Sequence, residues 1–291
     1  MKSIGLVLVV YGKHPLESVT YKSLNHSIST YLEYHKDLSF SIFLHNNGPE
    51  SYLCETESSE IYQEVIYSEA IDNSGLSKVY NAALNALSAD FYMILDDDTE
   101  ITYEFFVEFS RLVYLNNADL VCPQIISNSV VRYPKSGRGV IKDNGIISCL
   151  DRLSSISSGL ILSANLIRMM VTTFGKVFDE EFVLYGVDSS FFLRFRRLVK
   201  AHRFFSPLVY CFGKLNHSLS SDNIETMEVK SFREKERIYD LALQTRYYPR
   251  ISLFYLVPRE LLKSIRFRRG FNGVVDYITV LISGCHPRNR S

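Results

Sequence analysis

Three consecutive aspartates, Asp96, Asp97 and Asp98, directly follow a strongly apolar run from Phe91 to Leu95. A short apolar run that ends at once in acids is typical of a buried strand that emerges at a sheet edge. Carboxylates at alternate positions, Asp96 and Asp98, are expected to point to the same side. Mg²⁺ and Mn²⁺ prefer hard oxygen ligands and usually bind one or two carboxylates together with substrate phosphates. The pattern favours a site for a metal-bound diphosphate, but acids at a strand end also solvate turns and cap helices.

The elements around this junction alternate between strand and helix patterns. Continuous apolar runs or period-two alternation predict the strands, which span residues 4–10, 39–45, 64–67 and 91–96. Apolar residues at helical spacing predict the helices, which span residues 16–34, 76–87 and 103–115. Alternation of this kind predicts an α/β fold with a doubly wound, mostly parallel sheet flanked by helices. Such sheets bind ligands outside the carboxyl ends of their strands.

The second half of the chain continues the pattern less regularly. A strand is expected over 119–124, and the polar, glycine-containing stretch 127–158 is interpreted as a long loop or hairpin beside the site. An apolar block over 159–162 precedes the remaining elements, which are helices over 165–174 and 188–199 and a strand over 207–212. After about residue 223 the chain is expected to be helical and basic.

Composition excludes several classes of protein. Hydrophobic residues make up 46% and charged residues 22% of the 291 residues, as in ordinary globular proteins. Thirty-two Lys and Arg balance 32 Asp and Glu, so no global field indicates nucleic acid as a partner. The five cysteines have no paired spacing, which argues against a zinc knuckle or disulfide framework and fits a reducing cytosol. The sequence contains no run of about 18 uncharged apolar residues, so no membrane-spanning helix is predicted.

Two common nucleotide-binding motifs are missing from the sequence. The end of the first strand, Val10 to Pro15, lacks the glycine spacing that cradles a pyrophosphate, which argues against a dinucleotide-binding dehydrogenase. No Walker-type glycine loop followed by Lys-Ser or Lys-Thr occurs either. The segment Met1–Val10 has one basic residue and no small-residue cleavage site, so we interpret it as a first strand rather than a signal peptide.

Short strings in a fixed order carry a resemblance to a known family. They are Leu8-Val9-Val10-Tyr11, Leu44-His45-Asn46-Asn47-Gly48, Asn73-Ser74-Gly75 with Asn81, Leu95-Asp96-Asp97-Asp98-Thr99, Ser157-Ser158-Gly159, Val187-Asp188 with Phe192-Leu193-Arg194, Asn216-His217-Ser218-Leu219, and Arg246-Tyr247-Tyr248-Pro249-Arg250. Each string is weak by itself. In this order, and over most of the chain, they resemble the family 2 glycosyltransferases of the GT-A fold, especially bacterial rhamnosyltransferase-like members.

The resemblance implies roles for these residues. Asp96 and Asp98 would hold Mn²⁺ or Mg²⁺ against the diphosphate of a nucleotide sugar, with Asp98 as the direct ligand and Asp96 nearer the ribose or a water shell. His217 would supply an imidazole to the metal or to the diphosphate. Ser158 and Gly159 would line the acceptor side. Nucleotide-sugar contacts are expected from Tyr11, Asn46, Asn47, Asn73, Gly75, Asn81, Asp96 and Asp97. A solvated loop histidine, and asparagines that only form turns and caps, remain the alternatives.

The same resemblance implies that Asp188 is the catalytic base. If a helix starts there, Asp188 shares a face with Phe192 and Phe195 and points inward. The helix dipole favours the ionised carboxylate, which is the state that takes a proton from an acceptor hydroxyl. An ordinary N-cap aspartate would look identical, and Glu180 and Glu181 are lesser candidates for the base. Single displacement with inversion is the mechanism that the resemblance implies, and one base without a clear second acid agrees with it.

The sequence departs from the family pattern at three positions. Asn46 stands where the family has an aspartate that helps to select the nucleotide base, so the identity of the base stays open. Val187 replaces the acid often found before Asp188, and Ile251 replaces the asparagine after Arg250.

The resemblance also implies a division of the chain. Residues 1–125 would form the nucleotide-sugar-binding half, 126–222 the acceptor-binding half and 223–291 a helical C-terminal region, for which membrane association is one alternative. From Lys230 to Ser291 there are thirteen Lys and Arg against five Asp and Glu. The stretch 258–281 is basic and amphipathic, so it lies on anionic lipid, packs on the catalytic domain or forms a homodimer. Its basic residues are Arg259, Lys263, Arg266, Arg268 and Arg269.

The leading hypothesis is a metal-dependent inverting glycosyltransferase, of hexosyl- or rhamnosyltransferase type. It would move a sugar from a nucleotide sugar to a glycan or polyprenyl-linked glycolipid in bacterial surface polysaccharide synthesis (O-antigen or capsule). It would be cytoplasmic, or peripheral on the cytoplasmic face of the inner membrane. One alternative is a catalytically silent nucleotide-sugar-binding or assembly protein on the same scaffold. Another is a haloacid-dehalogenase-type phosphatase, which carries Asp-x-Asp on its first strand; here several strand–helix units precede the motif, and Glu100 occupies its fifth position.

Overall fold

A computed structural model describes most of the chain, namely residues 1–52, 60–115, 117–137, 139–148, 150, 152–202, 204–218, 226–250, 252–267 and 271–289. Outside the described part lie Cys54, Cys149, Leu219, Ile251, Arg268 and Arg269, and the side chain of Arg266 is not described either. The chain divides into two compact units. The first unit comprises residues 1–74, 79–177 and 194–222, and the second comprises 75–78, 178–193 and 223–291. The functional boundaries expected at 125 and 222 stay a prediction.

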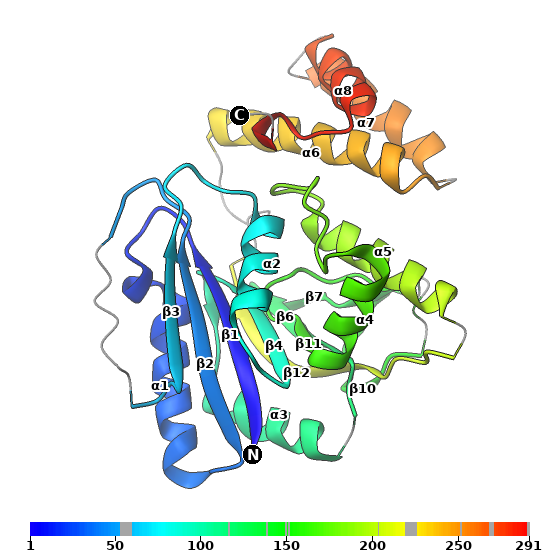
Figure 1. The fold of residues 1–291 in the computed structure, drawn as a ribbon. Helices are drawn as coiled ribbons and strands as arrows, with labels where there is room; N and C mark the ends of the chain where they lie inside the picture. The colour runs from blue at the N-terminus through cyan, green and yellow to red at the C-terminus, as the bar shows by residue number, and fades with distance from the viewer. Residues whose placement is uncertain are drawn as a thin grey trace. The chain divides into compact units, whose positions relative to one another are not determined.

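One large sheet forms the centre of the first unit (Figure 1). Its main strands, in spatial order, are β10 (Gly145–Ile146), β12 (Val209–His217), β6 (Leu120–Ser127), β11 (Ile161–Ser163), β4 (Phe91–Asp96), β1 (Lys2–Val10), β2 (Leu38–Asn46) and β3 (Glu64–Glu69). Neighbouring strands from β4 to β3 are parallel, as are β6 and β12, whereas β11 runs antiparallel between β4 and β6. The predicted doubly wound, mostly parallel sheet is confirmed.

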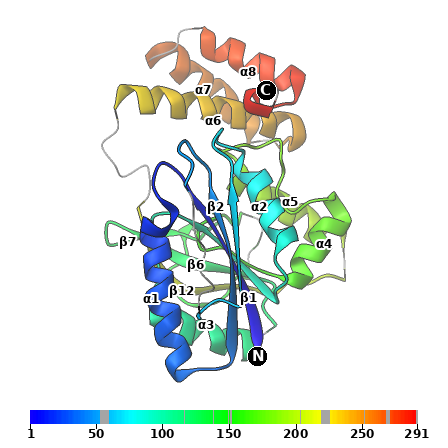
Figure 2. The same cartoon turned by 60° about the vertical axis from the view of Figure 1, so that its left-hand side comes forward.

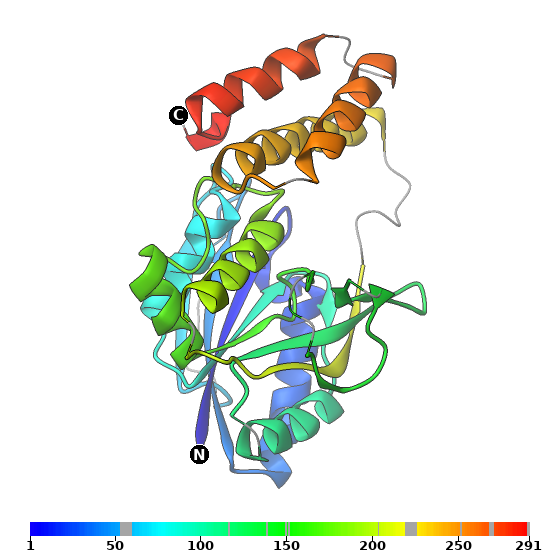
Figure 3. The same ribbon diagram turned by 90° about the vertical axis from the view of Figure 1, so that its right-hand side faces the viewer.

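Helices cover both faces of this sheet because its central strands are apolar on both sides. Along β1, residues Ile4, Leu6 and Leu8 join the core formed with α1 (Val19–Tyr34) and α3 (Tyr103–Leu115). Figure 3 shows α1 and α3 on one side of the sheet and α4 (Ala164–Phe174) on the other. Two further helices, α2 (Leu76–Ala86) and α5 (Val187–Ala201), have their first residues in the second unit.

The helix expected from residue 16 starts later than predicted. A short 3-10 turn, η1 (Pro15–Glu17), comes first, and Ser18 then caps α1 by accepting a hydrogen bond from the Tyr21 N–H at 3.1 Å. Serine at this position satisfies one of the helix's unpaired N–H groups, which sets the start of α1 at Val19.

Of the two alternatives for the polar stretch 127–158, a long loop or a hairpin, the structure shows short antiparallel strand pairs. β7 (Val130–Tyr133) pairs antiparallel with β6, and β8 (Lys135–Ser136) pairs with β9 (Gly139–Val140). β10 pairs with β12 at the sheet edge, and β5 (Thr99–Glu100) pairs with the other end of β12. This places His217, at the end of β12, opposite Thr99.

Three helices form most of the second unit: α6 (Met227–Tyr247), α7 (Leu253–Phe267) and α8 (Asn272–Ser283), followed by η2 (Pro287–Asn289) (Figure 2). Arg246 on α6 donates to the carbonyl oxygens of Leu281 and Ile282 at 2.8 and 2.9 Å, which ties α6 to the end of α8. An added Cβ at Gly273 would lie 2.0 Å from Ser264 Oγ, so α7 and α8 approach closely there. Among the described residues, no helix is long and apolar enough to span a bilayer.

Candidate functional site

The three aspartates form a turn at the carboxyl end of β4. The strand ends at Asp96, and Asp97 and Asp98 lead into β5. Strand alternation therefore does not set the direction of Asp98. Each carboxylate instead contacts a different part of the first unit.

Asp97 is held by the loop that follows β1. Its Oδ2 accepts a hydrogen bond from the Tyr11 N–H at 3.2 Å, and its Oδ1 lies 3.2 Å from the Lys13 ammonium. Asp96 Oδ1 accepts from the Tyr80 hydroxyl at 3.2 Å, and Asp98 Oδ1 lies 3.2 Å from His217 Nδ1. Lys13 and Tyr80 were not predicted, because neither stands out from ordinary surface or core residues in the sequence.

Buried hydroxyl groups form hydrogen bonds with the turn that contains the three aspartates. Thr99 Oγ1 lies 2.8 Å from His217 Nδ1 and 2.6 Å from Ser158 Oγ, and Ser158 Oγ accepts from the Asp96 N–H at 3.0 Å. Thr20 Oγ1 donates to the Asp96 carbonyl at 2.5 Å and accepts from the Thr99 N–H at 2.8 Å. We call Thr20, Thr99, Ser158 and His217 the hydroxyl network. Thr20, Thr99 and Ser158 are at most 1% exposed, so the turn has little freedom to rearrange.

Burial acts on both members of the Asp98–His217 pair. It raises the pKa of Asp98, and it lowers the pKa of His217, although each group favours the charged form of the other. The nearby Asp97 adds to the rise at Asp98. Burial thus opposes ionisation of both side chains, and their mutual attraction offsets only part of that cost.

A divalent cation fits this donor set. Among the described residues, no three His, Cys, Asp or Glu side chains converge as a metal cluster. Mg²⁺ and similar ions, however, often take only one or two carboxylates and complete their shell with phosphates and water. Asp98 and His217 would supply that kind of partial shell, whereas Asp97 is engaged by Lys13 and Asp96 by Tyr80.

The predicted asparagine contacts form a second cluster, at the ends of β2 and β3. Asn46 donates to Glu69 Oε2 at 2.8 Å and to the Glu50 carbonyl at 2.7 Å. Asn47 donates to Asn73 Oδ1 at 3.1 Å and to the Ser74 carbonyl at 3.0 Å. The two clusters share one edge of the sheet, since the Asn47 N–H also donates to the Val10 carbonyl at the end of β1. Asn46 and Asn47 are buried, so in this structure they organise the turn after β2.

Glu69 is a candidate residue that was not identified from the sequence. It ends β3 and is exposed, yet hydrogen bonds from Ser51, the Tyr52 N–H and Asn46 lower its pKa to about 2. The Glu69 carboxylate thus lies beside Asn46, the position at which the family pattern has an aspartate. A single glutamate at the end of a weak strand gives no signal that could have indicated this contact.

Two residues expected on the acceptor side have structural roles here. The Ser158 hydroxyl is buried in the hydroxyl network. Gly159 has φ +87°, and an added Cβ would lie 2.5 Å from Leu215 Cδ1, so both the backbone and the packing require glycine. Their contact with an acceptor stays a prediction.

The other predicted donor contacts differ in exposure. Tyr11 is 51% exposed, so its ring is open to solvent directly after β1. Asn81 is buried on α2. Gly75 belongs to the second unit, where an added Cβ would lie 3.3 Å from Val183 Cγ1, which indicates close packing.

The candidate base also lies in the second unit. Asp188 is the second residue of α5 and is partly buried, while Phe192, one turn further along, is 1% exposed. The predicted helix start is therefore confirmed within one residue. Burial, followed by the charge of Asp179, raises the pKa of the lesser candidate Glu181. The Glu180 carbonyl accepts a hydrogen bond from Asn289 at 2.8 Å.

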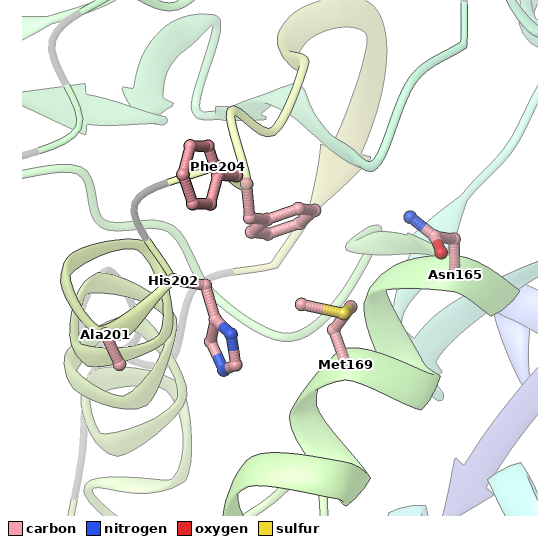
Figure 4. A pocket seen from close by; sticks show the side chains of 6 residues that line it. Asn165, Met169, Ala201, His202 and Phe204 are labelled. Atoms are coloured by element: carbon pink, nitrogen blue, oxygen red, sulfur yellow. The ribbon is translucent and has the colours of Figure 1, made fainter.

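A separate pocket of about 620 Å³ lies at the C-terminal end of α5 (Figure 4). It is lined by Asn165, Met169, Ala201, His202, Phe204 and Phe205. His202 Nε2 lies 2.9 Å from Thr173 Oγ1, which fixes the imidazole ring on its wall. The pocket contains none of the predicted site residues.

Known proteins support the assignment of the fold. The crystal structure of S. aureus TarS 1–349 superposes with a TM-score of 0.53 at 12% identity, covering 97% of this chain and 81% of that one. The same fragment in complex with UDP-GlcNAc gives 0.54 at 12% identity, over 99% and 82%. The longer S. aureus TarS structure gives 0.55 at 13% identity, but this chain covers only 50% of it. At such identities the likeness establishes the fold alone.

The mixed, mostly parallel sheet with its acidic turn after β4 thus has the GT-A fold of glycosyltransferases. The family model for glycosyl transferase family 2 matches residues 17–201, and the chain belongs to this family. It is therefore a glycosyltransferase, and the phosphatase hypothesis is wrong. No curated protein matches the sequence. The rhamnosyltransferase-like subtype stays a prediction.

Proposed function

We propose that this enzyme transfers a sugar from a nucleotide sugar to a glycan or polyprenyl-linked acceptor, with Mn²⁺ or Mg²⁺ and with inversion. The observation that carries the proposal is the Asp96–Asp98 turn, which the hydroxyl network holds at the carboxyl edge of the sheet. Ligands of open α/β sheets bind at this edge. The similar S. aureus TarS fragment crystallised with UDP-GlcNAc and with UDP, which supports a nucleotide-sugar donor.

The donor would lie along the carboxyl ends of β1, β2 and β4. The exposed Tyr11 ring offers a stacking surface for a nucleotide base. Lys13 adds positive charge beside Asp97, where it would attract the diphosphate. Glu69 and Asn46 would contribute to selection of the base. Asn47, Asn73 and their hydrogen bonds would hold this edge in shape.

Asp98 and His217 would hold the cation, with Asp96 nearby. When bound, the cation neutralises negative charge on the leaving nucleoside diphosphate. The chain's own contribution is preorganisation, since Thr99 and Ser158 hold the ligand side chain and the turn backbone before the substrate arrives.

Asp188 would act as the general base. As an ionised carboxylate in the first turn of α5 it would accept the proton from the acceptor hydroxyl. The hydroxyl oxygen then forms a bond to the anomeric carbon while the bond to the nucleoside diphosphate breaks. A single displacement of this kind inverts the anomeric configuration.

Transfer by the wild-type protein is the direct test. We expect UDP-, dTDP- or GDP-sugar turnover with Mn²⁺ or Mg²⁺, loss of turnover with EDTA, and recovery on adding back the cation. Donor binding should also raise the melting temperature in the presence of the cation, because a ligand that binds the native state stabilises it. Full activity in EDTA would contradict the metal role. Tight donor binding without turnover on any acceptor or water would support the silent-scaffold alternative.

The exposed apolar surface of the C-terminal helices favours a membrane site for the acceptor. Exposed apolar side chains form a stripe that starts at Phe271, directly before α8, and continues along the helix with Val275, Ile278 and Ile282, at spacings of about one helical turn. It differs from the buried stripe of Gly273, Tyr277 and Val280. Together with the basic surplus of this region, these residues would bind an anionic bilayer, where a polyprenyl-linked acceptor resides.

Sedimentation with lipid vesicles tests this placement. The wild-type protein should sediment with phosphatidylglycerol vesicles but not with phosphatidylcholine vesicles, and less of it should sediment at high salt. Ile278→Glu should abolish sedimentation, because it places a charge within the exposed stripe. Val229→Glu, at an exposed position on α6 outside the stripe, is the matched control. Sedimentation unchanged by Ile278→Glu, or a concentration-dependent dimer that Ile278→Glu disrupts, would contradict lipid binding by this face.

A further inference from the structure

The C-terminal helices and the segment that carries the candidate base belong to one compact unit. Residues 178–193 group with 223–291. Tyr248 donates to Asp179 Oδ2 at 2.5 Å, and the rings of Tyr248 and Phe182 lie 6.0 Å apart. Asn289, at the end of η2, also donates to the Glu180 carbonyl. The helices after residue 223 therefore support the residues that precede Asp188.

The carboxylate of Asp240 on α6 lies directly against the turn before Asp188. Gly186 has φ +86°, and an added Cβ there would lie 2.1 Å from Asp240 Oδ1 and 2.5 Å from Phe182 Cδ1. Only glycine permits both the backbone conformation and the close approach. The turn that starts α5 is thus shaped around the Asp240 side chain.

Gln244, one turn further along α6, connects this carboxylate to α5. Its Nε2 donates to Asp240 Oδ1 at 2.7 Å and to Ser189 Oγ at 3.1 Å. Its Oε1 accepts from Arg250 at 2.7 Å. Both amide hydrogens and the amide oxygen are used, and Gln244 is buried. Ser189 is the residue after Asp188, so this amide fixes the backbone beside the base.

The charges around Asp240 couple it to the base. Burial raises the pKa of Asp240 to about 6; Gln244 and Arg250 oppose the rise, and Asp188 adds to it. The neighbouring charged residues on α6 have partners of their own. Glu236 lies 3.3 Å from His286 and 3.0 Å from Arg288, and the Arg237 guanidinium lies over the Tyr185 ring.

We infer that Asp240, Gln244 and Arg250 are positioning residues that hold Asp188 in the orientation for proton abstraction. The inference rests on the proposed role of Asp188 as base. It makes the helical C-terminal region part of the catalytic apparatus, in addition to any contact with a membrane. Asp240 acts on Asp188 through charge and through the Gly186 turn, and Gln244 acts through Ser189.

Gln244→Leu tests the geometric part, because leucine has a similar size but no polar atoms. We expect kcat to fall roughly 10- to 100-fold with the donor KM nearly unchanged, since small displacements of a catalytic group are costly. Amide hydrogen exchange over residues 186–193 should become faster, whereas exchange in α8 should not change. Glu228→Gln, an exposed change on the same helix, is the control and should leave kcat and exchange unaltered.

Asp240→Asn tests the electrostatic part. The asparagine oxygen can still accept from Gln244, so kcat at its optimum should stay within about threefold of the wild type. The acidic limb of the pH–rate profile should move to lower pH, because the wild-type limb includes the titration of Asp240, which has a pKa of about 6, and the asparagine does not titrate. Wild-type kcat and exchange in Gln244→Leu, or an unmoved acidic limb in Asp240→Asn, would overturn the inference. A wild-type protein without transfer activity would refute the proposed function instead, and the exchange experiment would still test the positioning.

Discussion

Asp98→Ala is expected to lower kcat/KM for sugar transfer by roughly 100- to 1,000-fold, because a metal ligand lost from the leaving-group site removes several kcal/mol of transition-state stabilisation. Asp98 is the carboxylate nearest His217, at 3.2 Å, and burial has already raised its pKa. Removing it leaves His217 without its anionic partner. Steady-state kinetics over a range of Mn²⁺ concentrations provide the measurement, with a higher cation concentration needed for half-maximal rate.

Glu100→Gln is the matched control for this prediction. Glu100 is an exposed carboxylate two residues further along, and it accepts a hydrogen bond from Asn216 at 3.2 Å. Its replacement removes the same charge from the same turn region and should change kcat/KM by less than about threefold. Equal losses in both variants would mean that local charge, rather than metal ligation by Asp98, sets the rate. Wild-type activity in Asp98→Ala would remove the basis of the proposed metal site.

Asp188→Asn is expected to lower kcat by roughly 100- to 10,000-fold, the range over which general bases contribute. Asparagine keeps the size and hydrogen-bonding capacity of the side chain in the first turn of α5 but accepts no proton. Donor binding should therefore persist, and the donor-induced rise in melting temperature should match that of the wild type.

Variants of the two neighbouring glutamates identify the base. Glu180→Gln and Glu181→Gln should each retain most of the activity if Asp188 is the base. Burial raises the pKa of Glu181, so a loss confined to Glu181→Gln would transfer the role to that residue. If an added nucleophile restored transfer by Asp188→Asn and the product kept the anomeric configuration of the donor, the single-displacement mechanism would be contradicted.

Local sequence patterns were sufficient to predict the central elements of the fold, but not β5, the short strands β7 to β10 or the second half of β12, which was expected to end at residue 212. Apolar runs and helical periodicity predicted β1, β2, β4 and α3 within about two residues, because these patterns reflect burial on both faces of a strand or one face of a helix. The position of the acidic turn followed from the same argument, since a buried strand must become polar where it leaves the core. The start of α5 at Val187 was predicted within one residue.

Other features depend on contacts between residues far apart in the chain. β11 runs antiparallel between β4 and β6. This brings Ser158, which lies 62 residues after Asp96 in the sequence, within hydrogen-bond distance of the Asp96 N–H. β12 brings His217 to Thr99 across 118 positions. No local pattern specifies such pairings, because they follow from strand order and from the packing of whole elements.

The sequence by itself determined the central strands β1, β2 and β4, most helix bounds and the acidic turn, since periodicity and composition record which faces are buried. Only the tertiary structure decided what each site residue contacts. It placed the Ser158 hydroxyl in a buried network, paired Asn46 with Glu69 and joined α6 to the segment that carries Asp188. The physical reason is that hydrogen bonds between distant residues form only after packing has brought their elements together, and a single sequence carries no local trace of that proximity.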